Sequence, residues 1–306
     1  MFHMIPACEF RRRAREAMKL VMSVLIMVML VAMLPSLIGN TVTMITGSDP
    51  SQALADLYTE ERITAMLDPD LAVSQAAMEE FLGGIKAFFL EKWPFIALTT
   101  AITLIFSPVL NLGQNHTLLK ALRKEEISAG TVLARLPLFF RAIGLRLMTA
   151  LRIFLWMLPG WAVSMVGAVA LVFVPSVGIL LVFAATILML VLMLRAMYSY
   201  RLAPYVMADA PDTGVGAAIR RSVQVMNGRR MELFSLEFSF FGWRLLLQMG
   251  QMILLSMFGS VIGMTLGMFV SFFLQMYINM SEAAFYQEYA VGPAQAAAAE
   301  ETGNSD

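Results

Sequence analysis

The residues that could carry out catalysis are few and lie far apart in the sequence. The only histidines are His3 and His116, and the only cysteine is Cys8. A zinc protease needs two histidines and a glutamate in the pattern HExxH, which does not occur. The GxSxG turn of serine hydrolases and the phosphate-binding loop of ATPases are also absent. We therefore predict that the protein is not an enzyme and has no catalytic, cofactor-binding or metal-binding residues.

The polar residues that stand out lie inside apolar stretches, where an ionised side chain costs about 3 kcal/mol or more. Glu237 and Arg244 are seven residues apart, which is roughly 10 Å along a helix. Each would need a partner on another helix; alternatively, Glu237 lies at headgroup level and Arg244 extends its side chain toward it. Pro159 and Gly160 would kink a second apolar helix. These four residues form the candidate intramembrane polar site.

The composition places these residues in a membrane protein. Hydrophobic residues make up 59% of the 306 residues and charged residues only 14%, against about 25% charged in soluble domains. Mean hydropathy is +0.72. The formal net charge is zero, which gives no indication of a nucleic-acid partner. We predict an all-α, polytopic bundle of membrane helices.

Long apolar runs predict six transmembrane helices, because about 20 apolar residues are needed to cross a bilayer. The predicted spans are 18–38, 93–113, 146–173, 177–200, 233–257 and 260–285. Between spans three and four, the sequence VPSVG (174–178) indicates a tight hairpin. Between spans five and six, FGS (258–260) is the predicted break.

Basic residues decide the orientation of these spans. Of the 22 lysines and arginines, 17 fall before span one, between spans two and three, between spans four and five, or at the adjoining edges of these spans. The segment between spans one and two has three basic and nine acidic residues. By the positive-inside rule, both termini are then cytoplasmic. We predict a bacterial cytoplasmic membrane protein whose partners are anionic inner-leaflet lipids and other membrane proteins.

The remaining segments are assigned from their local patterns. The predicted parts of the chain are a basic cytoplasmic N-terminus at 1–17, a transmembrane domain at 18–290, an outer loop at 39–92, an amphipathic helix at 214–227 and a disordered tail at 291–306. The outer loop should hold two amphipathic helices, because aspartate followed by proline at 49–50 and 68–69 favours a helix start. The helix at 214–227 should lie on the cytoplasmic face of the membrane.

Two further sets of residues are predicted to hold the bundle in place. Aromatic and basic residues at the ends of spans are typical membrane-interface anchors, here Tyr198, Tyr200, Arg201, Tyr205 and Trp243. Small residues four apart let two helices approach closely, here Gly259, Gly263 and Gly267. This glycine stripe would pack inside the bundle or in a dimer.

Four sequence segments resemble a known family when they are taken in order. They are LWMLPGW (155–161), YSYRLAPYVMADAP (198–211), RRSVQVMNGRRMELFSLEFSFFGW (220–243) and YINMSEAAFYQEY (277–289). Together they resemble the bacterial "domain of unknown function 975" family of polytopic membrane proteins. The resemblance implies a membrane fold and carries no activity with it. The long acidic outer loop and Arg244 depart from the family pattern.

Two functional hypotheses follow from the sequence. The first is a non-enzymatic membrane component or accessory subunit of a transport or envelope complex, which fits the lack of catalytic groups. The second is a small permease or exporter with a cavity near Pro159 and Gly160, close to Glu237 and Arg244.

Overall fold

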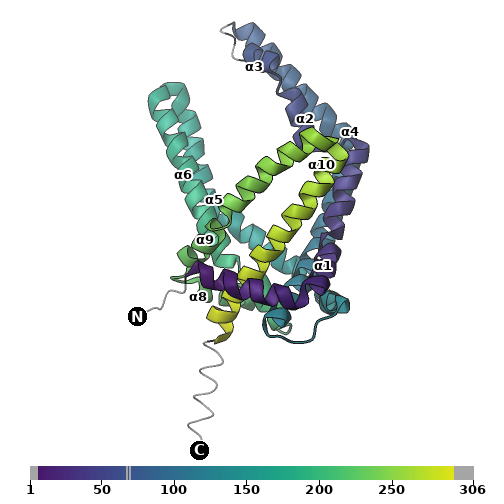
Figure 1. The fold of residues 1–306 in the computed structure, drawn as a ribbon. Helices are drawn as coiled ribbons and strands as arrows, with labels where there is room; N and C mark the ends of the chain where they lie inside the picture. Colours follow the sequence, from purple (N-terminus) through teal and green to yellow (C-terminus); the bar gives the residue numbers. More distant parts are fainter. Residues whose placement is uncertain (1–5, 67, 69, 293–306) are drawn as a thin grey trace, which may run out of the picture. The chain divides into compact units, whose positions relative to one another are not determined.

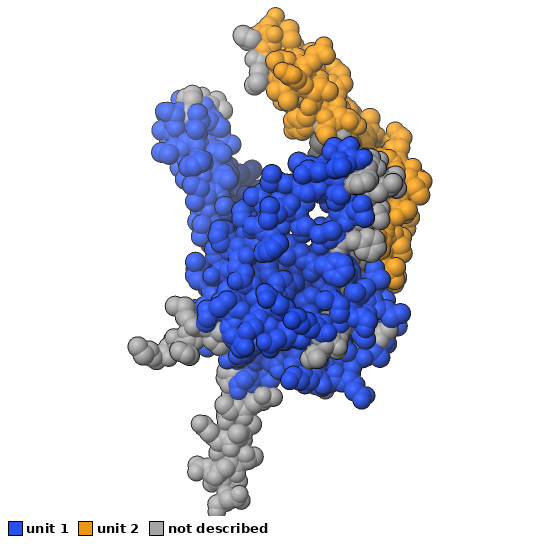
Figure 2. Space-filling view, viewed as in Figure 1, with its two compact units in different colours: residues 1–32, 108–306 blue, residues 33–107 orange. Residues whose placement is uncertain are grey.

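The computed structural model describes residues 6–66, 68 and 70–292, and every regular element in that part of the chain is a helix (Figure 1). The elements are α1 (Ala7–Thr46), α2 (Pro50–Leu57), α3 (Glu60–Met66), α4 (Leu71–Leu122), η1 (Ala129–Leu138), α5 (Phe139–Phe173), α6 (Pro175–Tyr200), α7 (Ala203–Asp209), α8 (Val215–Met226), α9 (Arg230–Phe238), α10 (Phe241–Tyr286) and η2 (Gln287–Val291). The all-α prediction is therefore confirmed. The chain divides into two compact units, residues 1–32 with 108–306 and residues 33–107 (Figure 2).

Four helical stretches of the described chain, where we predict six, are long and apolar enough to cross a membrane. They are Ala72–Leu122, Gly130–Leu171, Ser176–Asp209 and Arg230–Met257. The other predicted spans, 18–38 and 260–285, lie inside α1 and α10, but both contain positions whose side chains are outside the described residues. The described residues there form no unbroken apolar window of membrane length, so the number is corrected to four. The predicted tail, 291–306, lies outside the described residues from 293 onward.

α5 and α6 form an antiparallel hairpin at the place where VPSVG predicts one. α5 ends at Phe173, and the extended backbone of Val174 (φ −141°, ψ 85°) separates it from α6. The two helices are very close at Gly160, where an added Cβ atom would lie 2.8 Å from the Cβ of Met189. α5 remains helical through Pro159. The hairpin is therefore packed tightly at the predicted kink.

α10 is one continuous helical element that doubles back on itself, as Figure 1 shows. Its two arms are in contact, because a Cβ on Gly263 would lie 2.7 Å from the carbonyl oxygen of Leu254. Gly267 faces Gln251 of the first arm in the same way. Gly259, the third glycine of the predicted stripe, lies outside the residues whose surroundings the structure describes. The glycines thus serve close packing within one hairpin.

α8 matches the predicted amphipathic helix at 214–227 in position. Its apolar side chains Ala218, Ile219 and Met226 are buried, and the helix packs on α5, α6 and α7. Its apolar face is therefore covered by protein, whereas we predict that it faces the membrane. The reason is that burial against other helices removes the same apolar surface from water.

The unit formed by residues 33–107 holds most of the predicted outer loop. α2 begins at Pro50, as predicted, and Tyr58 meets Phe81 edge to face at 4.9 Å between ring centroids. Asp70 accepts a hydrogen bond of 2.9 Å from a backbone N–H in the first turn of α4. α4 then continues without a break to Leu122, so the second predicted loop helix and the span at 93–113 are one helix. Leu90, Glu91 and Lys92, which directly precede the predicted span, are all good helix formers and join the two.

Candidate functional site

A group of polar side chains gathers where α6, α7, α9 and the second arm of α10 meet. We call this group the polar core; its members are Tyr198, Arg201, Tyr205, Glu237 and Glu282. Arg201 occupies the short junction between α6 and α7. Pro204 lies in the first turn of α7, where a residue without a backbone N–H loses no hydrogen bond. The sequence therefore ends one helix and starts another around Arg201.

Arg201 pairs with both carboxylates of the polar core. Its Nη2 donates a hydrogen bond of 2.7 Å to Oε1 of Glu282, and its Nε lies 3.3 Å from Oε1 of Glu237. Glu282 comes 81 residues after Arg201 in the chain. A single guanidinium thus ties α9 and the second arm of α10 to the α6–α7 junction, in the bridging geometry for which arginine is well suited.

Two tyrosine hydroxyls face the other oxygen of each carboxylate, while the contact between Arg201 Nε and Glu237 Oε1 is an ion pair without a hydrogen bond. The hydroxyl of Tyr198 donates to Oε2 of Glu237 at 2.8 Å. The hydroxyl of Tyr205 lies 3.4 Å from Oε2 of Glu282 and 3.2 Å from the backbone carbonyl of Asn279. Each carboxylate of the polar core is therefore held by Arg201 on one oxygen and faces a tyrosine hydroxyl with the other.

The polar core is shielded from water unevenly. Glu282 is only 3% exposed, whereas the side chain of Arg201 is 40% exposed. A buried carboxylate is stable only when it is paired and hydrogen-bonded. Glu282 therefore depends on Arg201 more than Arg201 depends on Glu282. The cluster contains two acids and one arginine, so its formal charge is −1 when both acids are ionised.

A second ion pair lies next to the polar core. Asp209, at the end of α7, accepts from Arg123 at 2.8 Å and from the hydroxyl of Tyr286 at 3.3 Å. The Asp209 carboxylate raises the pKa of Arg123 by this hydrogen bond. The ring of Tyr286 also stacks on Tyr205 of the polar core, with centroids 5.9 Å apart. The two clusters thus join the ends of α4, α7 and α10.

The start of α1 is fastened to the end of α10 and to η2, which follows it. Arg13 forms an ion pair of 2.6 Å with Glu288, and the rings of Phe10 and Phe285 lie 5.3 Å apart. Ala14 and Met18 are also buried. The basic segment predicted as a cytoplasmic N-terminus is therefore an amphipathic helix with its apolar face packed on protein.

The residues predicted as an intramembrane polar site are not brought together. Glu237 belongs to the polar core, but Arg244 is exposed on α10. Pro159 and Gly160 lie within the α5–α6 hairpin, where Gly160 contacts Met189. We predict Glu237 and Arg244 on one helix, seven residues apart. They lie on two helices instead, because α9 ends between them at Phe238.

The residues predicted as interface anchors divide into two groups. Tyr198, Arg201 and Tyr205 belong to the polar core. Tyr200 is buried, and its hydroxyl accepts a hydrogen bond of 3.2 Å from Nε1 of Trp156. Trp243 is exposed on α10. The aromatic and basic pattern after α6 therefore serves contacts within the protein.

Glu282 is the residue that the sequence reasoning missed. It directly follows the uncharged run 245–281 and lies in the last turn of the predicted span 260–285, where a charged residue is common. An acid flanked by small and apolar residues, in SEAAFYQEY, is the signal that could have identified it, because such an acid needs a buried partner. Its partner could not be named, because Arg201 lies on a distant segment.

The described chain is thus an α-helical protein with four helical stretches long and apolar enough to cross a membrane and with a buried ionic cluster where several helices meet. The chain belongs to the family described as "Protein of unknown function (DUF975)", whose sequence model matches residues 9–290. The predicted family is therefore confirmed. Comparisons with curated proteins and with solved structures find no match.

Proposed function

We propose that this chain is a non-enzymatic, multi-pass component of a bacterial cytoplasmic membrane that serves as an accessory subunit of a transport or envelope complex. Four helices of membrane length support the membrane location. Membership of a family of unknown function agrees with this role without naming a partner.

The observation that carries the proposal is the exposure of the α5–α6 hairpin. The two helices pack closely on each other. Both also contact α8, and α6 contacts α9. Large apolar side chains on the hairpin are open, with Phe183 63% and Trp161 55% exposed. Apolar surface of this kind marks a membrane or protein interaction site. We infer that a transmembrane helix of the partner covers it.

A small permease or exporter is the alternative function. It needs a solute cavity near Pro159 and Gly160, together with free polar groups along the path. Contact with Met189 fills the space at Gly160, and Glu237 is paired with Arg201. Both contacts favour the accessory role.

Cross-linking in the native membrane tests the accessory role. A photo-reactive amino acid replaces Phe183 in the full chain, and in a second variant it replaces Trp161. We expect the same protein adduct from both positions. A matched probe at Gln224, exposed on α8, controls for random collisions. Lipid adducts alone from both hairpin positions would show that no partner covers the hairpin.

A genetic experiment separates the permease from the accessory subunit. It compares the Glu237→Gln and Arg244→Gln variants in a strain that lacks the wild-type chain. The accessory role predicts that Arg244→Gln restores the strain, because this side chain is exposed and outside the polar core. Loss of solute export in both variants, at normal expression and folding, would favour the permease.

A further inference from the structure

An apolar groove runs between the start of α1 and the two arms of α10. It has a volume of about 540 Å³. Met18 of α1 and Leu247, Val270 and Phe273 of α10 supply apolar walls. Trp243 and Tyr277, whose rings have both apolar and polar edges, complete the lining on the α10 side.

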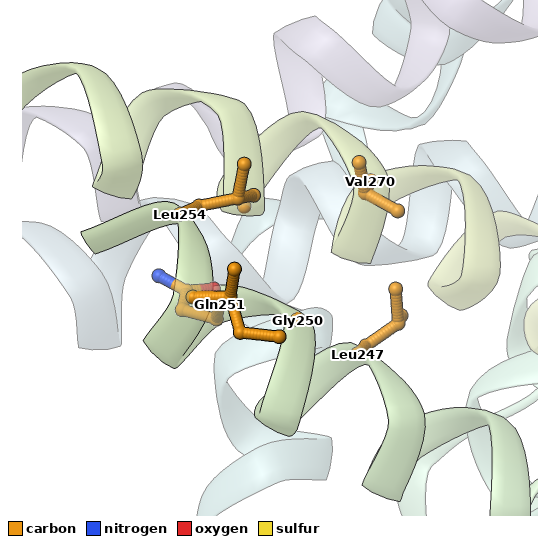
Figure 3. Close-up of a pocket in the computed structure, with 7 residues that line it drawn as sticks. Leu247, Gly250, Gln251, Leu254 and Val270 are labelled. Carbon is orange, nitrogen blue, oxygen red and sulfur yellow. The ribbon is translucent and has the colours of Figure 1, made fainter. Parts of the chain in front are cut away.

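A second hollow extends this groove between the arms of α10. Figure 3 shows its lining, with Leu247 and Val270 facing it from opposite arms. Its volume is about 310 Å³, and it shares these two residues with the first groove. From Trp243 to Leu254 the path covers 11 residues of helix, about 16 Å. That length matches one leaflet, half of the roughly 30 Å hydrocarbon core.

Two cations line the same groove on the α1 side. Arg15 and Lys19 are one helical turn apart, and both are exposed. Neighbouring Arg12 and Arg13 pair with Glu9, but within the described part of the chain neither Arg15 nor Lys19 forms an ion pair. Two unpaired cations that line the same groove attract an anion, because hydrogen bonds between charged groups are stronger than those between neutral ones.

We propose that this groove binds one anionic phospholipid. The phosphate lies between Arg15 and Lys19, and an acyl chain follows Leu247 and Val270 toward Leu254. A cationic mouth and a long apolar path select a molecule with a negative head and a hydrocarbon tail. Such a lipid would fasten the start of α1 to the α10 hairpin. The inference rests on the proposed membrane location and is independent of the accessory role.

Native mass spectrometry of the full chain in mild detergent tests this site. Phosphatidylglycerol and phosphatidylcholine with identical acyl chains serve as probes. We expect one molecule of phosphatidylglycerol to bind at least about tenfold more tightly than phosphatidylcholine, because the choline cation of phosphatidylcholine offsets the attraction of the phosphate to Arg15 and Lys19. Equal affinities for the two lipids would overturn the proposal.

Matched variants locate the binding. The double variant Arg15→Gln and Lys19→Gln should lose this tenfold preference, and the surface position of both residues should leave the fold intact. The control, Lys124→Gln and Arg220→Gln, removes the same charges from two exposed positions elsewhere and should keep the preference. Equal loss in both double variants would show nonspecific charge attraction.

Further experiments distinguish a phospholipid in the groove from inorganic phosphate or a protein partner. Inorganic phosphate at millimolar concentration should not displace the lipid, because it lacks an acyl chain; displacement would reduce the site to an anion site. Val270→Trp should fill the groove and lower lipid occupancy while Arg15 and Lys19 remain, and Leu247→Trp serves if the first variant unfolds. A photo-reactive residue in place of Trp243 should label lipid. A protein adduct there instead would overturn the proposal.

Discussion

Arg201 is the residue on which the polar core depends. It is paired with both Glu237 and Glu282, and Glu282 has almost no access to water. An ion pair in such a place adds little net stability over an apolar contact, but removing one partner leaves a charge that is buried alone. The polar core is therefore sensitive to the loss of this one side chain.

Replacing Arg201 by methionine tests that dependence. We expect Arg201→Met to lower the free energy of unfolding by about 3 kcal/mol, because Glu237 and Glu282 lose their cation. Denaturant titration of the purified chain in detergent measures the effect. The control Arg244→Met, at an exposed position, should change stability by less than about 0.5 kcal/mol. Similar values for the two variants would contradict the assignment.

At the scale of single elements, the α5–α6 hairpin depends on the absence of a side chain at Gly160. We expect Gly160→Val to destabilise the hairpin by about 1–3 kcal/mol, because its Cβ would lie 2.8 Å from the Cβ of Met189. Gly83→Val, in the interior of α4, is the matched control, since nothing lies within 4 Å of a Cβ there. Both changes alter helix propensity by the same amount, so thermal unfolding of the pair reports the clash. A difference near zero would mean that the helices are not in contact.

The start of α1 should respond to acid. Hydrogen bonds from Arg12, and then Arg13, hold the pKa of Glu9 below its usual value of 4.5. A carboxylate with a lowered pKa stabilises the fold above its unfolded pKa, and this stabilisation is lost as pH falls through the folded value. Amide exchange protection in residues 10–16 should therefore decrease below about pH 4.

A matched pair of variants assigns this acid response. Glu9→Gln should show reduced protection in residues 10–16 already at pH 7 and no further acid-dependent loss. Glu16→Gln is the control, because its contact with Arg12 is longer, at 3.7 Å, and both side chains are exposed. If Glu9→Gln keeps the wild-type pH profile, the response belongs to another group.

For the whole molecule, the number of transmembrane spans decides on which side of the membrane residues 39–70 lie. With six spans, Asp68 lies outside, opposite Cys8; with four, α1 does not cross and both lie on the same side. Cys8 is exposed, and so is Asp68. In intact cells, we expect a membrane-impermeant maleimide to give the same result, labelling or protection, for wild-type Cys8 and for the Cys8→Ser, Asp68→Cys variant. Labelling of only one of the two would contradict the four-span arrangement.

Local patterns predicted much of the architecture. The all-α class, the hairpin at Val174 and the close packing at Gly263 follow from apolar runs, turn residues and small residues, which act over a few positions. The extent of α4 was not predicted, because proline at 94 and 108 does not end the helix there. Of the polar core, Glu237 was predicted as a polar site residue, Tyr198, Arg201 and Tyr205 only as interface anchors, and Glu282 not at all.

The sequence by itself determined that the chain is helical, that its helices are long and apolar enough for a membrane, and that its family is the one its motifs resemble. These properties depend on residue type and spacing along the chain. Only the tertiary structure decided that Arg201 meets Glu282 across 81 residues and that Arg244 stays outside. The reason is that such pairings depend on how each helix is rotated and where its hairpin turns, and no period within one segment specifies the segment it will face.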